Sequence, residues 1–310
     1  MKITLRTALL TLATAIVALA ATAYIFVIGF IYSTQVKDNV YTVHSESPLS
    51  RIGANIVAFN TGAQWVMVDT HLGPLAGGAN SEIKSMADQP VAIAFNTHWH
   101  PDHSGGNAAF TDEADIVAHQ YVRDILSGPH AASGLTAPGS IHAYSAAAPA
   151  GLPETIVTDR RLFDVNGMKF EAVPFPGAHT GGDLAIFARD FNVVALGDLI
   201  WPGGFPFIDL QNGGSALGLA DALDTILSES NGDTVFIAGH GAPMTYAEVK
   251  SYSGMIRETI NVVQTQLAKG LTVSEIQTQG LAPVWRSWSS NLVSESEWIR
   301  MVAAGVPDSK

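Results

Sequence analysis

Residues 97–103 read Thr-His-Trp-His-Pro-Asp-His, and the fold and chemistry expected of the whole chain depend on this segment. It holds three of the ten histidines of the protein, together with one carboxylate. Imidazole nitrogen and carboxylate oxygen suit Zn²⁺, and also Fe or Mn when a carboxylate contributes. This density of ligand side chains predicts a metal site rather than a chance cluster of surface histidines.

The surroundings of the segment place it on a loop at the end of a buried strand. The apolar run Val91–Asn96 precedes it, and a Ser-Gly-Gly-Asn turn typical of a helix start follows. His98 and His100 are two residues apart, so in an extended chain they point to the same side and can share one ion. Asp102 and His103 come after the bend at proline and are expected to face a second position nearby.

The segment resembles the H-x-H-x-D-H signature of the metallo-β-lactamase superfamily. Other motifs of that family have counterparts in the same order over residues 52–242. Asp69 follows the strand-like run Trp65–Val68 and resembles the first motif, an aspartate that supports the metal loop. The remaining counterparts are His179 in Pro-Gly-Ala-His-Thr, Asp198 in Leu-Gly-Asp and His240 in Ala-Gly-His-Gly.

The resemblance implies a centre with two metal ions. The implied ligands of one ion are His98, His100 and His179; those of the second are Asp102, His103 and His240; Asp198 lies between the ions. Seven ligands for two ions leave room for a bridging water, which a hydrolytic site needs. The implied cofactors are two Zn²⁺ ions, with Fe or Mn as alternatives, and Asp102 is the implied catalytic residue because it would orient the bridging hydroxide.

The implied activity is hydrolysis of an ester, thioester or lactone carbonyl by a metal-bridging hydroxide. The bridging Asp198 resembles hydroxyacylglutathione hydrolases and lactonases more than dedicated β-lactamases, some of which use a Cys ligand that this chain lacks. The chain also has no Gly-x-Ser-x-Gly elbow, so neither a serine nor a thiol nucleophile is expected. The alternatives are a β-lactam-hydrolysing enzyme and a membrane-tethered metal-binding module without catalysis.

The amino-terminal segment carries a second signal. Lys2 and Arg6 precede an uncharged, mainly apolar run from Thr7 to Tyr32. As a helix this run of about 26 residues would reach ~39 Å, enough to span a bilayer. We predict a retained membrane anchor in residues 1–33, with membrane contact over residues 7–32. The alternatives are a signal peptide cleaved near Ala21–Ala23, which would lead to secretion, and a buried core helix.

Charge predicts the orientation and the partners. The two basic residues at the amino end should stay cytoplasmic by the positive-inside rule, which places an inner-membrane-anchored catalytic body in the periplasm. The net charge of −12, without a Lys/Arg cluster near the motifs, weighs against a nucleic-acid partner. The expected partner is a small-molecule substrate.

The chain composition is typical of a globular enzyme, with 47% hydrophobic and 14% charged residues. Strand-like and helix-like patterns mix along the chain and predict an α+β fold, for which the resemblance implies an αββα sandwich. We divide the chain into the amino-terminal segment 1–33, a catalytic domain at residues 34–245, and a carboxyl-terminal helical extension at residues 246–310 packed on it.

Two segments are candidates for the rim of the site. Residues 128–153 are too long for an ordinary connection and are predicted to be a lid carrying His142, with a mobile surface loop as the alternative. Residues 200–209 directly follow Asp198 and contain three aromatic residues that either form an apolar substrate wall or are buried in the sandwich. These residues are Trp201, Phe205 and Phe207.

Other polar residues are expected to have structural roles. Asp209 should shape its loop and open the next helix, and Asp183 should order the loop around His179. His71 is expected to be hydrogen-bonded or exposed, although its closeness to Asp69 in the sequence could bring it near the metal mouth.

Overall fold

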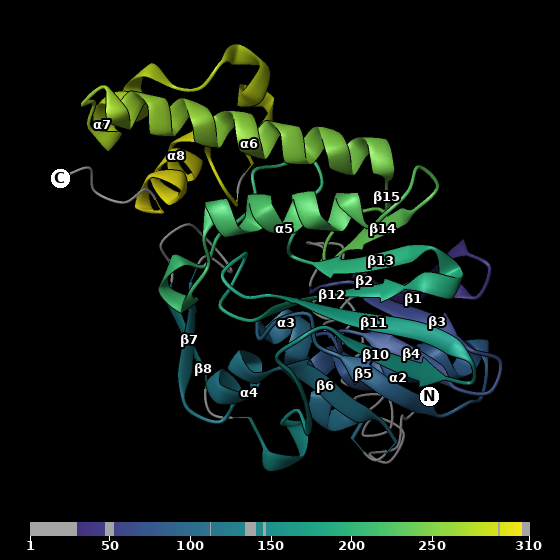
Figure 1. Cartoon of the computed structure of the whole chain (residues 1–310). Coiled ribbons are helices and arrows are strands. Elements are labelled where there is room, and N and C mark those ends of the chain that lie inside the picture. The colour runs from purple at the N-terminus through teal and green to yellow at the C-terminus, as the bar shows by residue number, and fades with distance from the viewer. Residues whose placement is uncertain are drawn as a thin grey trace, which may run out of the picture.

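Two β-sheets pack face to face at the centre of the molecule, and helices cover their outer faces (Figure 1). The computed structural model describes residues 30–46, 53–111, 113–133, 141–144, 147–290 and 292–305. The predicted α+β sandwich is confirmed by this arrangement.

The first sheet has seven strands in the order β1-β2-β3-β4-β5-β6-β9. Strands β1 to β4 form an antiparallel meander, whereas β4, β5, β6 and β9 run parallel. The strands are β1 (Phe30–Lys37), β2 (Val40–Glu46), β3 (Ile56–Asn60), β4 (Trp65–Val68), β5 (Val91–Phe95), β6 (Asp115–His119) and β9 (Thr155–Val157). Because parallel strands end at the same edge of a sheet, the loops after β4 and β5 lie side by side.

The second sheet has six strands in the order β10-β11-β12-β13-β14-β15. Its one parallel pair is β13 and β14, so the loops that follow these two strands also meet at one edge. The strands are β10 (Arg161–Val165), β11 (Met168–Phe175), β12 (Asp183–Ala188), β13 (Val193–Gly197), β14 (Val235–Ala238) and β15 (Met244–Thr245). A separate two-stranded sheet pairs β7 (His130–Ser133) with β8 (Ile141–Tyr144).

Helices flank both sheets. The α-helices are α2 (Gly73–Met86), α3 (Pro101–Ser104), α4 (Gln120–Leu126), α5 (Ala216–Ser228), α6 (Tyr246–Ala268), α7 (Val273–Gln279) and α8 (Glu295–Ala304). Short 3-10 turns cover Asn107–Ala109, Pro149–Gly151, Arg189–Phe191, Leu210–Asn212 and Pro283–Trp288. Helices α6 and α7 each begin with a capping box, in which a threonine and the glutamate three residues later satisfy the free backbone amides.

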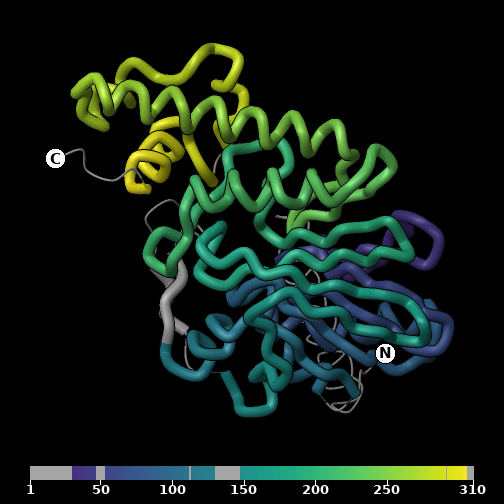
Figure 2. The backbone as a smooth tube through the Cα atoms, viewed as in Figure 1, coloured from purple at the N-terminus to yellow at the C-terminus, as the bar shows by residue number. Residues whose placement is uncertain are grey.

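Three apolar layers hold these elements together. Between the sheets, Phe59 meets Phe170 edge to face with ring centroids 5.4 Å apart. On the outer face of the first sheet, α2 contributes Ala76 and Ile83 to a separate buried cluster. On the outer face of the second sheet, α5 lies between the strands and the carboxyl-terminal helices, as Figure 2 shows. The apolar patterns of strands and helices therefore close into a layered core.

The predicted membrane anchor is wrong at its carboxyl end. Phe30 to Tyr32, the last residues of the apolar run, begin β1, where Phe30 pairs with Glu46 of β2. Ser33 in the same strand bonds through its amide and hydroxyl to Glu82 of α2, at 3.0 and 2.7 Å. The strand continues an apolar stretch without a charge, so hydropathy alone could not mark the boundary. Residues 1–29 lie outside the described part of the chain, and no helix within that part is long and apolar enough to cross a membrane.

Candidate metal centre

Loops at one end of the two sheets bring the predicted ligands together. The H-x-H-x-D-H segment follows β5, and His179 lies between β11 and β12. Asp198 and His240 follow the parallel pair β13 and β14, and Asp69 follows β4. Each of these residues stands where a buried strand ends, so the rigid sheets fix the starting point of every loop.

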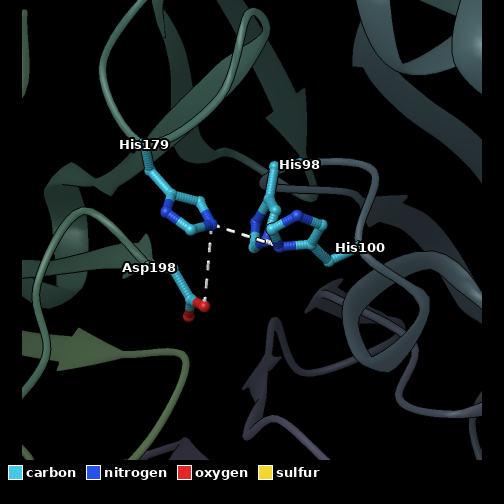
Figure 3. Close-up of side chains that lie close together, drawn as sticks. All are labelled: His98, His100, His179 and Asp198. Atoms are coloured by element: carbon cyan, nitrogen blue, oxygen red, sulfur yellow. Dashed lines mark hydrogen bonds and ion pairs between the residues drawn. The ribbon is translucent and has the colours of Figure 1, made fainter. Parts of the chain in front are cut away.

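The first group joins three histidines and one aspartate (Figure 3): His98, His100, His179 and Asp198. The His100 Nδ1 atom lies 2.9 Å from His98 Nε2 and 3.2 Å from His179 Nε2. Burial, above all, lowers the pKa of His179 to about 4 and the pKa of His98 well below its usual range. Three imidazoles whose nitrogens converge on one point form the donor set of a metal site.

The outward-facing nitrogens of these rings have their own partners. The His100 Nε2 atom lies 3.0 Å from Oδ2 of Asp209, and both side chains are buried. His179 donates from Nδ1 to the carbonyl of Phe207 at 2.8 Å. Such bonds fix the tautomer of each ring and leave its other nitrogen free to bind a metal ion.

Asp209 is the site residue that the sequence reasoning missed, since it was expected only to shape a loop. It does bind its loop, because its backbone carbonyl accepts from Gly214 and from Asn212 at 2.9 and 3.1 Å. The contact with His100 adds a second role. The only available signal was that Asp209 is the one carboxylate in residues 199–212.

The second group consists of Asp102, His103 and His240. His240 Nε2 lies 3.3 Å from Asp102 Oδ2, and Asp198 Oδ1 lies 3.3 Å from His103 Nε2. Asp198 therefore reaches both groups, because its Oδ2 lies 3.8 Å from Nε2 of His179 in the first group.

Asp69 supports the second group from behind. Its Oδ2 lies 2.7 Å from His103 Nδ1, and its carboxylate accepts from the amide and hydroxyl of Thr97 at 2.8 and 2.9 Å. The aspartate after β4 thus connects His103 to the start of the metal loop. The resemblance implied a supporting role for this aspartate, and its role behind a metal ligand stays a prediction.

Two buried atoms test whether the two groups fit metal ions. His103 Nε2 and Asp198 Oδ1 lie 3.3 Å apart as an ion pair, and neither makes a hydrogen bond within the described residues. A buried polar atom without a hydrogen bond costs about 1–3 kcal/mol. Burial opposes protonation of His103, but the carboxylates of Asp198 and Asp69 hold its pKa well above its usual range. The surroundings therefore favour a positive charge at this point, and the donor sets fit metal ions.

Gly239 leaves the space that this arrangement needs. A Cβ atom at this position would stand 2.3 Å from Asp198 Oδ1 and 2.5 Å from His103 Cε1. The glycine amide donates to the Gly197 carbonyl at 2.7 Å, which joins the ends of β13 and β14. Both predicted ligand loops of the second sheet thus depend on close backbone approach.

The three aromatic residues after Asp198 divide between the two alternatives, a substrate wall and burial in the core. Trp201 lies beside His240 with ring centroids 4.6 Å apart, and with Pro202 it lines a pocket of about 270 Å³. Phe205 instead is fully buried and stacks on Trp298 of α8, with centroids 5.7 Å apart, so it belongs to the core. Phe207 is half-buried, with its ring 6.0 Å from that of His179. The side chain of His142, the fourth candidate, lies outside the described residues.

His71 and Asp183 both have structural contacts. The His71 ring is buried, its Nδ1 accepts from the Leu72 amide at 2.9 Å, and burial is the main cause that lowers its pKa to about 4. A Cβ on Gly53 would lie only 2.1 Å from this ring. Asp183 accepts from the amide and hydroxyl of Thr180 at 2.8 and 2.7 Å, and burial raises its pKa to about 7.

Comparison with known proteins gives one family match. The model of the metallo-beta-lactamase superfamily matches residues 50–240. A protein of Aquifex aeolicus described as uncharacterized is 24% identical over 213 residues, which are 68% of this chain and 94% of the relative. The hydroxyacylglutathione hydrolase GloC of Haemophilus influenzae is 30% identical over 89 residues, which are 29% of this chain and 41% of the relative.

Solved structures share the fold. A metallo-beta-lactamase from Pontibacter korlensis superposes with a TM-score of 0.59 at 15% identity, covering 73% of this chain and 99% of the other. The inverting sec-alkylsulfatase Pisa1 from Pseudomonas sp. superposes with a TM-score of 0.66 at 18% identity and covers 91% of this chain. This chain spans about half, 51%, of the length of that sulfatase.

Proposed function

The chain belongs to the metallo-beta-lactamase superfamily, whose members are generally hydrolases, and on that premise we propose that it is a dinuclear zinc-dependent hydrolase acting on an ester, thioester or lactone. The proposed ligands are the two groups described above.

The position of Asp198 is the observation that supports two ions rather than one. Its two carboxylate oxygens face different groups, 3.3 Å from His103 Nε2 and 3.8 Å from His179 Nε2. A site for a single ion would need neither a second group nor a carboxylate shared between them. Nitrogen and oxygen donors without sulfur suit Zn²⁺, with Fe or Mn as the alternatives.

The exposure of the ligands indicates where a substrate enters. The side chains of His240 and Asp102 are 23% and 17% exposed, whereas those of His98, His100 and His103 are almost completely buried. Two bound ions would lower the pKa of water and polarise a carbonyl. Asp102 stands at the open side and would orient the attacking water, while Asp69 holds His103 in place.

The proposed substrate class comes from the donor set and one relative. Hydroxyacylglutathione, named in the description of GloC, is a thioester. The similarity of this chain to a segment of GloC supports a substrate with an acyl carbonyl. The pocket beside His240 has an apolar wall of Trp201 and Pro202 that would receive a substituent of the substrate. A β-lactam is the alternative, and a metal-binding module without catalysis is the less favoured one because both ligand groups are complete.

Metal analysis followed by a substrate panel tests the proposal. Protein expressed with ample metal and purified without chelator should hold close to two transition-metal ions per chain, as measured by elemental analysis. It should hydrolyse at least one substrate of a panel of esters, thioesters, lactones and cephalosporins. Protein without tightly held metal would refute the proposed centre, and turnover of only the cephalosporins would favour the alternative substrate.

We also propose a periplasmic location, from Lys2 and Arg6 before the apolar run. Mass spectrometry of the mature amino terminus distinguishes a retained membrane anchor from the alternative, a cleaved signal peptide. An intact Met1 or its neighbour supports a retained segment, whereas a start near Tyr24 supports cleavage and secretion.

A further inference from the structure

One of the proposed ligands, His240, is held differently from the others. The remote ring nitrogens of His98, His100, His103 and His179 each lie within hydrogen-bond distance of a side chain or a carbonyl. Within the described residues no hydrogen bond reaches Nδ1 of His240. Its side chain is also the most exposed of the seven, at 23%. Apart from its contacts with the ring of Trp201 and the carboxylate of Asp102, the orientation of this ring depends on its backbone, in the segment Ala238–Gly241, which we call the His240 loop.

Asn55 bonds to the His240 loop at three carbonyls. Its Nδ2 donates to the carbonyls of Ala238 and Gly241, both at 3.0 Å. Its backbone amide donates to the carbonyl of Gly239 at 2.6 Å. The accepting carbonyls lie on both sides of His240 in the chain. The bonds connect Asn55, the residue before β3 of the first sheet, to the end of β14 in the second sheet.

The amide of Asn55 is itself fixed. It is 8% exposed, and its Oδ1 lies 2.8 Å from Nδ1 of His44 on β2. The Nε2 of His44 in turn lies 2.7 Å from the hydroxyl of Thr42. With both amide protons donated to carbonyls and the oxygen facing an imidazole, the side chain of Asn55 has one orientation and cannot rotate without losing buried hydrogen bonds.

We propose that Asn55 is a positioning residue for the second metal ion, acting through the His240 loop. This inference rests on the proposed dinuclear centre, and it assigns to a residue of the first sheet a role in a ligand supplied by the second sheet. Without the two side-chain bonds, the loop would keep its pairing with β13 at Ala238 and its backbone bonds from Asn55 and to Gly197. The ring of His240 would then sample more orientations, and an ion at the second group would be bound more weakly.

Zinc binding to the metal-free full-length protein tests this inference by calorimetric titration. The wild type should take up two equivalents. Asn55→Ala should bind the first equivalent as the wild type does and the second about 10- to 100-fold more weakly, the range seen when residues behind metal ligands are removed. Asn55→Asp keeps the shape but turns a carboxylate oxygen toward two carbonyls, so its loss should be at least as large.

A matched control separates positioning from general stability. Thr259 is a buried polar residue that accepts from Trp298 Nε1 at 2.9 Å, among the carboxyl-terminal helices. Thr259→Val should lower the melting temperature and leave both zinc affinities unchanged. If the Asn55 variants do not fold, His44→Ala gives the second measurement, with an expected weakening of about threefold confined to the second equivalent.

The outcomes distinguish the two proposals. A wild type that takes up only one equivalent refutes the dinuclear centre, and the role of Asn55 falls with it. A wild type with two equivalents and an Asn55→Ala variant that binds both with unchanged affinity overturns the inference alone. An unchanged second affinity in His44→Ala, where that variant is the one measured, overturns it as well.

Discussion

The two ligand groups differ in how much of their geometry exists before a metal ion arrives. In the first group every imidazole is buried, and Asp209 and the carbonyl of Phe207 hold the outer nitrogens of His100 and His179. In the second group Asp102 and His240 are partly exposed, and His240 is held through its backbone. The same fold thus provides one closed, preorganised group and one open group at the substrate side. We expect the first group to bind metal more tightly and the second to contact the substrate.

Removing Asp198 would erase this difference most completely, because the residue serves both groups. Asp198→Ala should lose the second zinc equivalent and reduce turnover on the order of 10²–10³, the usual cost of losing an electrostatic element at the reacting centre. Elemental analysis and steady-state kinetics measure the two effects. Asp164→Ala, at an exposed aspartate paired with Lys169, is the control and should change neither. Retention of both ions in Asp198→Ala would contradict the shared position of this carboxylate.

The next largest effect is expected from a change at Asp209, which contacts a ligand of the closed first group. Asp209→Asn replaces the carboxylate that faces His100 Nε2 and should weaken the first zinc equivalent about 10- to 100-fold. Competition with a chelator of known affinity measures this change. Asp221→Asn, at an exposed residue of α5, is the matched control. A loss confined to the second equivalent would show that preorganisation does not distinguish the groups.

The smallest expected effect concerns the two aromatic residues after Asp198. Trp201→Ala removes an apolar contact at the pocket worth about 0.5–1.5 kcal/mol, so KM should rise roughly two- to twelvefold with kcat little changed. Phe205→Ala empties a core position and should cost about 3–5 kcal/mol of unfolding free energy without a selective change in KM. Kinetics and thermal melts of both variants test the assignment. A KM effect in Phe205→Ala and none in Trp201→Ala would reverse it.

The fold and the residues of the centre could largely be predicted because their signals are local. The ligand motifs stand at the ends of apolar runs, and the structure brings the seven proposed residues together, although their roles as ligands stay a prediction. The contact of Asp209 with His100 spans 109 positions, and the sequence around either residue does not identify the other as its partner. The bonds of Asn55 to the His240 loop likewise span more than 180 positions.

Hydropathy assigned Phe30 to Tyr32 wrongly and left the surroundings of Phe205 open, for a common physical reason. Contact with a lipid, a substrate or a protein core removes the apolar surface of a residue from water in each case. The residue type therefore does not indicate which of these it contacts. Phe30 to Tyr32 belong to a strand that extends the first sheet, and Phe205 packs on Trp298. In both cases the deciding partner lies on an element distant in sequence.

The packing of His71 against Gly53 has a consequence for how this site can vary among related proteins. The ring occupies the space that any side chain at position 53 would need, and both residues have positive φ, +82° for Gly53 and +67° for His71. Position 53 is therefore constrained by the residue at position 71. Position 53 can gain a side chain only where position 71 has lost its ring, and glycine at 71 would relieve the backbone strain at the same time. Relatives with a side chain at position 53 should therefore lack the imidazole ring at position 71, whereas a smaller residue at 71 leaves glycine at 53 possible.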